Sequence, residues 1–289
     1  MFWDWTVSEY VTPHRNFNAR LGRWTSPDPF WGVHNMADNT ASILQAANLF
    51  LFTMNNPVRW LDPLGLFAIP ADFGHFKDDN PIVYEALNDL LYAWNALYRF
   101  YDDPYTPSDI RAMIPQMRQD IYNLANEMVS IGNRMTISVG WWISPIDGRL
   151  NATQITLLMS NPSAGRSMMS ATGMAEVRFR GQADGTMANA RKHAYWTALG
   201  VIRTGDVQFV RFFTDAHEFG TRHNFSEQYM FRHMAVDIHN NMIGFSIASD
   251  ALDRGFWARQ ASSHHNYIQR RTSNRNFNER TAWTMDRFR

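Results

Sequence analysis

The chain has 289 residues, of which 45% are hydrophobic and 14% aromatic, so it can build a core and is not an intrinsically disordered protein. Its 27 basic and 27 acidic residues cancel, which removes any general attraction to nucleic acid or to an anionic membrane. The sequence contains no cysteine, which excludes disulfides, thiolate zinc sites and cysteine nucleophiles.

Residues 1–66 are expected to form a β-type segment, because short apolar runs alternate there with turn-forming residues. The stretch FNARLGRWTSPDPFWG holds a glycine turn and then Ser-Pro-Asp-Pro, which forces extended or turn geometry around both prolines. The stretch ANLFLFTMNNPVRWLDPLGL holds two strand-like runs around Asn-Asn-Pro. Such a segment is too small to be stable alone, and residues 67–80 are expected to link it to a second domain.

Residues 81–289 are predicted to form a mostly α-helical domain with a minor β element, because apolar residues recur there at helical spacing. The predicted helices cover residues 80–103, 107–131, 151–161, 187–205, 206–220 and 226–250, with a weak helix nearer the C-terminus. Residues 135–144 are the best strand candidate, being rich in β-branched and aromatic side chains. Residues 163–187 are rich in glycine and serine and are expected to form a loop around a short strand or helix.

Several of these helices carry start or stop signals. Pro81 suits a first helical turn, and either Thr106 or Ser108 is expected to cap the second helix. Asp206 is a good capping residue for a later helix. Three glycines are expected to end helices: Gly132, Gly205 and Gly220.

No run of about 18 apolar residues is present, so no transmembrane helix is expected. The start MFWDWTVSEYV lacks a basic region followed by an apolar run, so no secretory signal is expected there. Between Asp253 and Arg289, eight arginines face three acidic residues, which leaves a local charge of +5. Such a segment is typical of a solvated extension, and alternatively of a phosphate-binding patch.

The stretch from Arg15 to Leu66 resembles the closing segment of the Rhs/YD-repeat core. It carries a Gly-Arg-aromatic run, Ser-x-Asp-Pro, Asn-Leu-aromatic, Asn-Asn-Pro and Asp-Pro-x-Gly-Leu in the order of that family. It departs from the family in the long insert VHNMADNTASILQAA. The resemblance implies that the chain is the tip of an Rhs-type polymorphic toxin, in which a large β-shell encloses a variable C-terminal toxin.

The same resemblance implies self-cleavage by an aspartyl-protease-like site. The acidic pair would be Asp28 and Asp62, and the bond cut would join Leu66 to Phe67. Two carboxylates held close can share a proton and activate water. The alternative is that both aspartates only cap Asp-Pro turns. An Rhs shell of a longer parent protein, a cognate immunity protein and secretion or delivery into a target cell are further implications.

Three successive predicted helices carry the candidate catalytic residues His193, His217, Glu218, Asp237 and Asn241. Asp237 and Asn241 are four residues apart and therefore share a helical face, at the edge of an apolar stripe. A carboxylate and an amide are costly to bury there unless they are paired or functional.

Three interpretations of this set stay open. It could hold a divalent metal, with His217, Glu218 and Asp237 as ligands. It could be a metal-free acid–base pair that activates water. It could also consist of buried polar side chains that only connect the helices by hydrogen bonds.

Residues 187–247 also resemble an uncharacterised α-helical domain found at the ends of bacterial toxins and cell-surface proteins. The residues that match its motifs are Asn189, Ala190, His193, Ala194, Trp196, Ala216, His217, Glu218, Asp237, Asn240, Asn241 and Gly244. Lys192 stands where arginine is common, and Val236 where methionine is. This resemblance favours a shared site and implies no particular reaction.

The sequence therefore favours a toxin whose helical domain is a His/Glu/Asp-dependent hydrolase. Its expected substrate is a phosphodiester or a phospholipid, and a nuclease is one form of this hypothesis. Alternatively, the amphipathic, aromatic-rich helices 80–103 and 107–131 could disrupt membranes without any catalysis. A structural or adhesive surface module is the third possibility.

Overall fold

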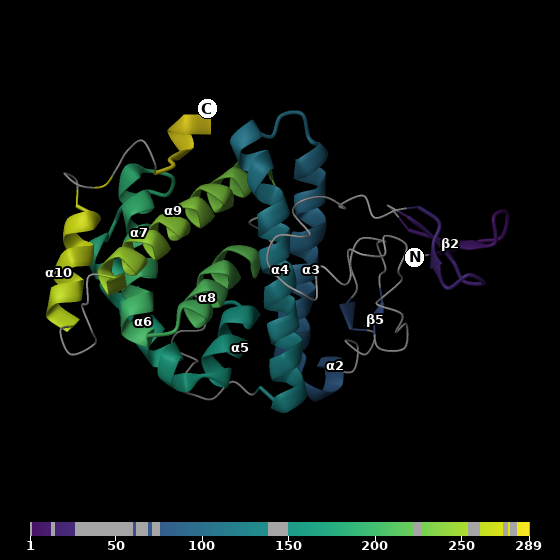
Figure 1. Ribbon diagram of the computed structural model, residues 1–289, viewed down its shortest axis with the longest axis horizontal. Coiled ribbons are helices and arrows are strands. Elements are labelled where there is room, and N and C mark those ends of the chain that lie inside the picture. Colours follow the sequence, from purple (N-terminus) through teal and green to yellow (C-terminus); the bar gives the residue numbers. More distant parts are fainter. Residues whose placement is uncertain are drawn as a thin grey trace. The chain divides into compact units, whose positions relative to one another are not determined.

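The computed structural model describes residues 2–12, 15–26, 60–61, 69–70, 76–137, 150–221, 227–253, 261–273, 277 and 282–288. The chain divides into two compact units, Met1–Asp79 and Asn80–Arg289. The described residues are mostly helical with a minor β element, which confirms the predicted fold class (Figure 1).

The first unit contains a small antiparallel sheet. Its strands are β1 (Phe2–Asp4), β2 (Glu9–Val11), β3 (Asn16–Asn18) and β4 (Arg23–Trp24), which pair in that order. Trp24 is buried, with the ring of Phe17 5.7 Å away and the guanidinium of Arg15 4.4 Å above its ring. Gly22 forms part of the β3–β4 turn with a φ of 65°, a conformation that favours glycine.

Three further short elements lie in this unit: β5 (Trp60–Leu61), β6 (Ile69–Pro70) and α2 (Phe76–Asp79). β5 and β6 pair as an antiparallel two-stranded sheet. The expected self-cleavage residues Asp28, Asp62, Leu66 and Phe67 all fall outside the described residues.

The helical unit begins with a pair of long helices, α3 (Pro81–Asp102) and α4 (Ser108–Arg134), which pack against each other (Figure 1). Both were predicted, and Pro81 stands in the first turn as expected. The apolar faces of both helices are buried, including Leu90 and Leu97 of α3 and Ile114 of α4. None of the helices in the described ranges is long and apolar enough to cross a membrane.

Two predicted details of α4 are wrong. Its N-cap is Pro107, and neither Thr106 nor Ser108 supplies a side-chain cap. The helix also continues past Gly132 to Arg134. The amide of Asn80 bonds the backbone just beyond that point, donating to the carbonyl of Met135 at 2.9 Å and accepting from the N–H of Ile137 at 3.0 Å. These two hydrogen bonds stabilise the extended chain that comes after the helix.

The next two helices are α5 (Ala152–Ser160) and α6 (Pro162–Arg178). The prediction of a loop around a short strand or helix at residues 163–187 is wrong for most of its length, because α6 is a continuous helix of 17 residues there. Asn161 caps α6 by accepting a hydrogen bond from the N–H of Ala164. Gly165 serves close packing, because a Cβ there would lie 2.7 Å from Cδ2 of Leu158 in α5.

The remaining helices are α7 (Met187–Thr204), α8 (Val207–Phe219), α9 (Gln228–Asp253) and α10 (Ala261–Arg271), followed by the 3-10 helix η7 (Met285–Phe288). Helices α7, α8 and α9 were predicted. Gly205 ends α7 in a left-handed conformation, and the carboxylate of Asp206 accepts from the N–H of Phe209 to cap α8.

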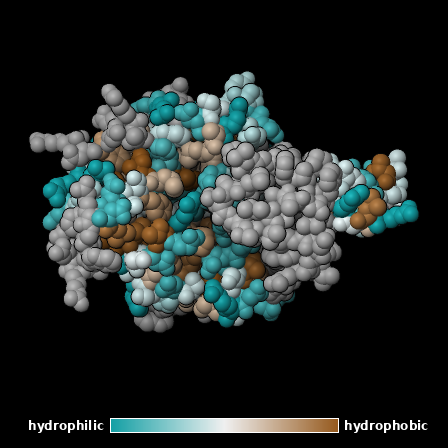
Figure 2. Space-filling view, in the orientation of Figure 1, coloured by the Kyte–Doolittle hydropathy of each residue, from teal (hydrophilic) through white to brown (hydrophobic). Residues whose placement is uncertain are grey.

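Helices α7 and α9 lie against each other, and α3 packs on α4 and α5. Helix α6 packs on α7, α10 contacts both α7 and α9, and α8 contacts α4, α5, α7 and α9 (Figure 1). Hydrophobic and hydrophilic patches both occur on the face of the helical unit that Figure 2 shows.

Two other expectations concern segments at the edges of the described residues. In the strand candidate 135–144, residues 135–137 form no strand, and the rest falls outside the part of the chain that the structure describes. In the basic C-terminal segment, Trp283 is buried and Arg287 forms an ion pair with Asp109 at 2.7 Å. Residues 282–288 are therefore packed on the helical unit and are not a free extension.

Candidate functional site

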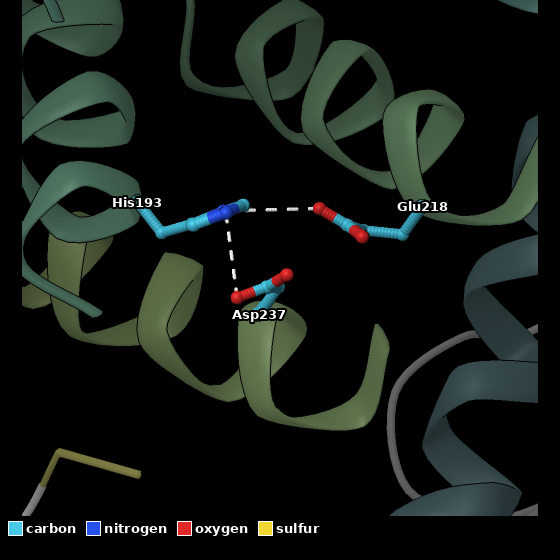
Figure 3. A group of neighbouring side chains, drawn as sticks. All are labelled: His193, Glu218 and Asp237. Atoms are coloured by element: carbon cyan, nitrogen blue, oxygen red, sulfur yellow. Dashed lines mark ion pairs between the residues drawn. The ribbon is translucent and has the colours of Figure 1, made fainter. Parts of the chain in front are cut away.

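Three helices bring together a trio of ionisable side chains. His193 projects from α7, Glu218 from the end of α8 and Asp237 from α9, and the three point toward one another (Figure 3). Each offers one nitrogen or oxygen atom, and these atoms all lie within 4.8 Å of one another. The side chains of His193, Glu218 and Asp237 are only 9%, 5% and 15% exposed.

The close approach of α7 and α9 explains why these residues meet. At Gly244 of α9, an added Cβ would lie 2.6 Å from the carbonyl oxygen of Ala194 and 2.7 Å from Cβ of Thr197, both on α7. The absence of a side chain at Gly244 therefore lets the two backbones come together. His193 and Asp237 lie on this interface, so their side chains reach each other directly.

The imidazole of His193 has a defined hydrogen-bonding environment. Its Nδ1 lies 3.2 Å from Oδ1 of Asn241, which also accepts a hydrogen bond from the hydroxyl of Thr197 at 3.0 Å. A carbonyl oxygen only accepts, so this arrangement places the ring hydrogen on Nδ1. The lone pair of Nε2 then points toward Oδ1 of Asp237, 3.3 Å away.

The two acids differ in their partners. Oδ1 of Asp237 accepts a hydrogen bond from the amide of Asn189 at 3.0 Å, which fixes the carboxyl group. Oε1 of Glu218 lies 3.8 Å from Nδ1 of His193. One acid therefore faces each nitrogen of the imidazole.

Burial shifts the protonation of all three groups toward their uncharged forms. It lowers the pKa of His193 to about 4 and raises the pKa of Asp237 to about 7. Burial also raises the pKa of Glu218 well above its usual value; the carboxylates of Asp237 and Asp215 add to this shift, and the amide of Asn241 opposes it. His193 is consequently uncharged at neutral pH, so its contacts with the two acids are not ion pairs under that condition.

An aromatic wall borders the site. The indole of Trp196 packs edge-on against the ring of His193, and its Nε1 donates a hydrogen bond to the hydroxyl of Thr172 at 2.9 Å. The same indole contacts the ring of His217, with 5.4 Å between the centroids. His217 is exposed and is not a member of the trio.

The structure therefore gathers four of the five predicted catalytic residues. Glu218, Asp237 and Asn241 meet at His193, and the group that could hold a metal contains His193 in place of the expected His217. Adjacent residues of a helix point about 100° apart, so Glu218 can face the interior while His217 faces out.

Two contributors to the site were not predicted, namely the roles of Asn189 and Thr197. Asn189, His193 and Thr197 are spaced four residues apart on α7, so they share one face with the histidine in the middle. This regular spacing of Asn, His and Thr along one face of the helix was the available signal.

A second polar group, also not predicted, lies beside the site on α8 and α4. Arg211 contacts Asp120 of α4 at 2.8 Å and Asp215 at 3.8 Å. Burial raises the pKa of Asp215 well above its usual value, the nearby Asp120 raises it further, and Arg211 lowers it. Arg211, Asp215 and Glu218 follow one face of α8 toward the trio.

Comparison with known families gives one match. Residues 157–276 match a family described as a domain of unknown function (DUF6973). The matched region is less than half of the chain, and it contains all the residues of the site. No curated protein matches the sequence, and no solved structure does.

Proposed function

We propose that the helical unit is a hydrolase that cleaves a phosphodiester bond, in phospholipid or in nucleic acid, and that it acts as the toxic part of an Rhs-type polymorphic toxin. The observation that carries this proposal is the convergence of His193, Glu218 and Asp237 from three helices. Secretion or delivery into a target cell, a cognate immunity protein and an Rhs shell in a longer parent follow from the resemblance of residues 15–66.

The protonation behaviour of the trio supports catalysis over a purely structural role. Here a neutral imidazole presents a lone pair to one carboxyl group, and two carboxyl groups are held where ionisation is unfavourable. Groups with such strongly shifted pKa values are typical of active sites.

Each residue has a distinct role in this proposal. Asp237, with a pKa of about 7, can give or take a proton near neutral pH and so suits the general base that activates water. Asn189 orients its carboxyl group, and Asn241, held by Thr197, orients His193. Glu218 completes the trio as a second carboxyl group for proton transfer to the leaving group.

A phosphodiester substrate suits the strong preference for arginine among the basic residues of the chain. Lys77 and Lys192 are its only lysines, so arginine makes up the rest of the 27 basic residues. The planar guanidinium binds phosphate oxygens in a bidentate manner, which lysine cannot do.

The alternative of membrane disruption without catalysis has less support. The amphipathic helices that suggested it are α3 and α4, and their apolar faces are buried inside the helical unit, as Leu90, Leu97 and Ile114 show. An interfacial helix would need this face free for lipid. Membrane insertion would therefore require the α3–α4 pair to open.

The direct test is turnover by the purified full chain of DNA, RNA and phospholipid vesicles, each measured by product analysis. We expect one class of phosphodiester to be cleaved, and expect His193→Gln, Glu218→Gln and Asp237→Asn to abolish cleavage. Asp250→Asn is the matched control, because Asp250 lies on the same helix as Asp237 in an exposed ion pair with Arg271. Cleavage that persists in all three site variants would refute the proposal, and dye leakage from vesicles without lipid turnover would favour membrane disruption.

A further inference from the structure

We propose that the trio binds one divalent cation of the borderline class, such as Zn²⁺ or Mn²⁺, through Nε2 of His193 and one carboxylate oxygen each of Glu218 and Asp237. This inference rests on the proposed function and names a cofactor for the same site; with the ion bound, Glu218 and Asp237 would act as its ligands in place of the proton-transfer roles given above. It rests on the geometry of the three side chains, and metal binding can be measured independently of activity.

The three ligand atoms are already close to the required positions. One nitrogen of His193 and one oxygen of each acid lie within 4.8 Å of one another, and the three side chains come from three different helices. Oδ1 of Asp237 lies 3.3 Å from Nε2, and Oε1 of Glu218 lies 3.8 Å from Nδ1. Bonds of about 2.0–2.2 Å to one tetrahedral ion would place ligand atoms about 3.5 Å apart. Asp237 is already at this distance from Nε2, and the carboxylate of Glu218 has to turn from the Nδ1 side of the ring toward Nε2 to become the third ligand.

The surrounding hydrogen bonds orient His193 as a metal ligand. Histidine ligands almost always donate the other ring N–H to a carbonyl or carboxylate, which fixes the tautomer. In this protein Oδ1 of Asn241 lies 3.2 Å from Nδ1, and the hydroxyl of Thr197 donates to the same oxygen. Nε2 is thereby left with its lone pair directed into the trio.

The contact between Nε2 and Asp237 also indicates that something positive belongs between them. Both atoms carry lone pairs, and they lie 3.3 Å apart in a buried position. Asn189 donates to the same oxygen of Asp237 and holds it in place. Either a proton or a metal ion bound between the two groups removes this repulsion. A metal ion could also take Glu218 as a ligand, because Oε1 of Glu218 lies 3.8 Å from the same imidazole ring.

The ligand types select the class of ion. Imidazole and carboxylate together suit Zn²⁺ and Mn²⁺, whereas Mg²⁺ and Ca²⁺ prefer shells made of oxygen alone. Three protein ligands leave at least one coordination position open, which is the arrangement of catalytic metal sites. The neighbouring acidic pair Asp120 and Asp215 is a poor alternative, because Arg211 already supplies its positive charge.

The test is calorimetric titration of the purified, chelator-stripped full chain with ZnCl₂, MnCl₂ and MgCl₂, each in turn. We expect one site per chain for Zn²⁺ or Mn²⁺ and none for Mg²⁺ at the same concentrations. Glu218→Gln and Asp237→Asn are expected to weaken binding at least about 100-fold, beyond the 10–100-fold loss that comes from removing an outer-shell partner. His217→Gln and Asp250→Asn are expected to leave it unchanged.

Thr197→Val keeps the test decisive if a carboxylate variant fails to fold. This substitution keeps the shape of the side chain and removes only the hydrogen bond to Asn241, so we expect about 10-fold weaker binding. No saturable binding of Zn²⁺ or Mn²⁺, or binding that Glu218→Gln and Asp237→Asn leave intact, would overturn the inference.

The two proposals fail separately. Turnover of a phosphodiester by the stripped protein in excess chelator would overturn the metal site and leave the hydrolase proposal standing. Tight metal binding at the trio with no turnover of any substrate class would overturn the hydrolase proposal and leave the metal site standing.

Discussion

Nε2 of His193 and Oδ1 of Asp237 face each other at 3.3 Å across the interface between α7 and α9. The hydrogen bond at the opposite side of the ring places the only ring hydrogen on Nδ1, so the facing atoms both carry lone pairs. Such a contact lowers the stability of the fold unless a proton or a cation bridges it. The metal-free protein should therefore be sensitive to the charge on Asp237.

Replacing Asp237 by asparagine should stabilise the metal-free protein. The raised pKa of Asp237, about 7, means that ionising this carboxyl group at pH 8 costs folding free energy. We expect Asp237→Asn to increase the free energy of unfolding on the order of 1–3 kcal/mol at pH 8. Urea denaturation of both proteins in chelator measures this difference. Asp250→Asn should stay within about 0.5 kcal/mol of the parent, and a destabilised Asp237→Asn variant would show that the carboxylate is a structural partner.

Asp215 should make stability depend on pH in a defined direction. Burial is the main cause of its raised pKa, so the folded state retains a proton that the unfolded chain releases near its usual value of 3.8. The stabilisation from this proton is complete below that value and is lost as pH rises through the folded-state pKa. The free energy of unfolding of the parent should therefore fall relative to that of Asp215→Asn between pH 4 and pH 8, as measured by urea denaturation. If the unfolding free energy of the parent instead rises relative to that of the variant over this range, Arg211 stabilises the ionised form of Asp215.

Two glycine substitutions should have opposite effects. Gly244→Ala would press a Cβ against Ala194 and Thr197 of α7, so we expect a loss of about 1–3 kcal/mol in unfolding free energy and a distorted site. Gly173→Ala lies in the interior of α6 with nothing within 4 Å of the added Cβ, so we expect a gain of about 0.5–1 kcal/mol. Thermal and urea unfolding compare the two. A Gly244→Ala variant whose unfolding free energy equals that of the parent would show that α7 and α9 can separate freely.

The helices could largely be predicted because their ends carry local chemistry. Asp206 caps α8 and Gly205 ends α7 by interactions within a few residues, so sequence spacing alone located them. The length of helix α6 was underestimated because glycine and serine lower helix propensity. Gly165 instead serves the contact with Leu158, and such a tertiary contact cannot be read from the local sequence.

The candidate residues could be named from the sequence, but their geometry could not. Spacing on one helix placed Asp237 and Asn241 on a shared face, and the motifs of successive helices added His193, His217 and Glu218 as candidates. The choice between His193 and the exposed His217 as the partner of the two acids depends on how α8 is rotated against α7. That rotation is set by packing between helices that are distant in sequence, so the sequence left both histidines as candidates.

Asn240 should anchor the C-terminal segment. Its fully buried amide donates to the carbonyl of Trp283 at 3.0 Å and accepts from the N–H of the same residue at 3.1 Å. Asn240→Ala leaves both backbone groups without these partners, so we expect a loss of about 2–4 kcal/mol in unfolding free energy. Denaturation followed by tryptophan fluorescence measures it. Asn123→Ala, on α4, should cost under about 0.5 kcal/mol; equal effects would mean that the Trp283 contact contributes nothing.

The most direct test of the central claim is growth of a bacterial host that makes the full chain, directed either to the cytoplasm or to the periplasm. We predict that the parent protein stops growth in one compartment and that soluble, folded Glu218→Gln and Asp237→Asn variants do not. Asp250→Asn should remain as toxic as the parent. Growth arrest by both site variants at parent strength would contradict the claim that His193, Glu218 and Asp237 form the active site of a toxin.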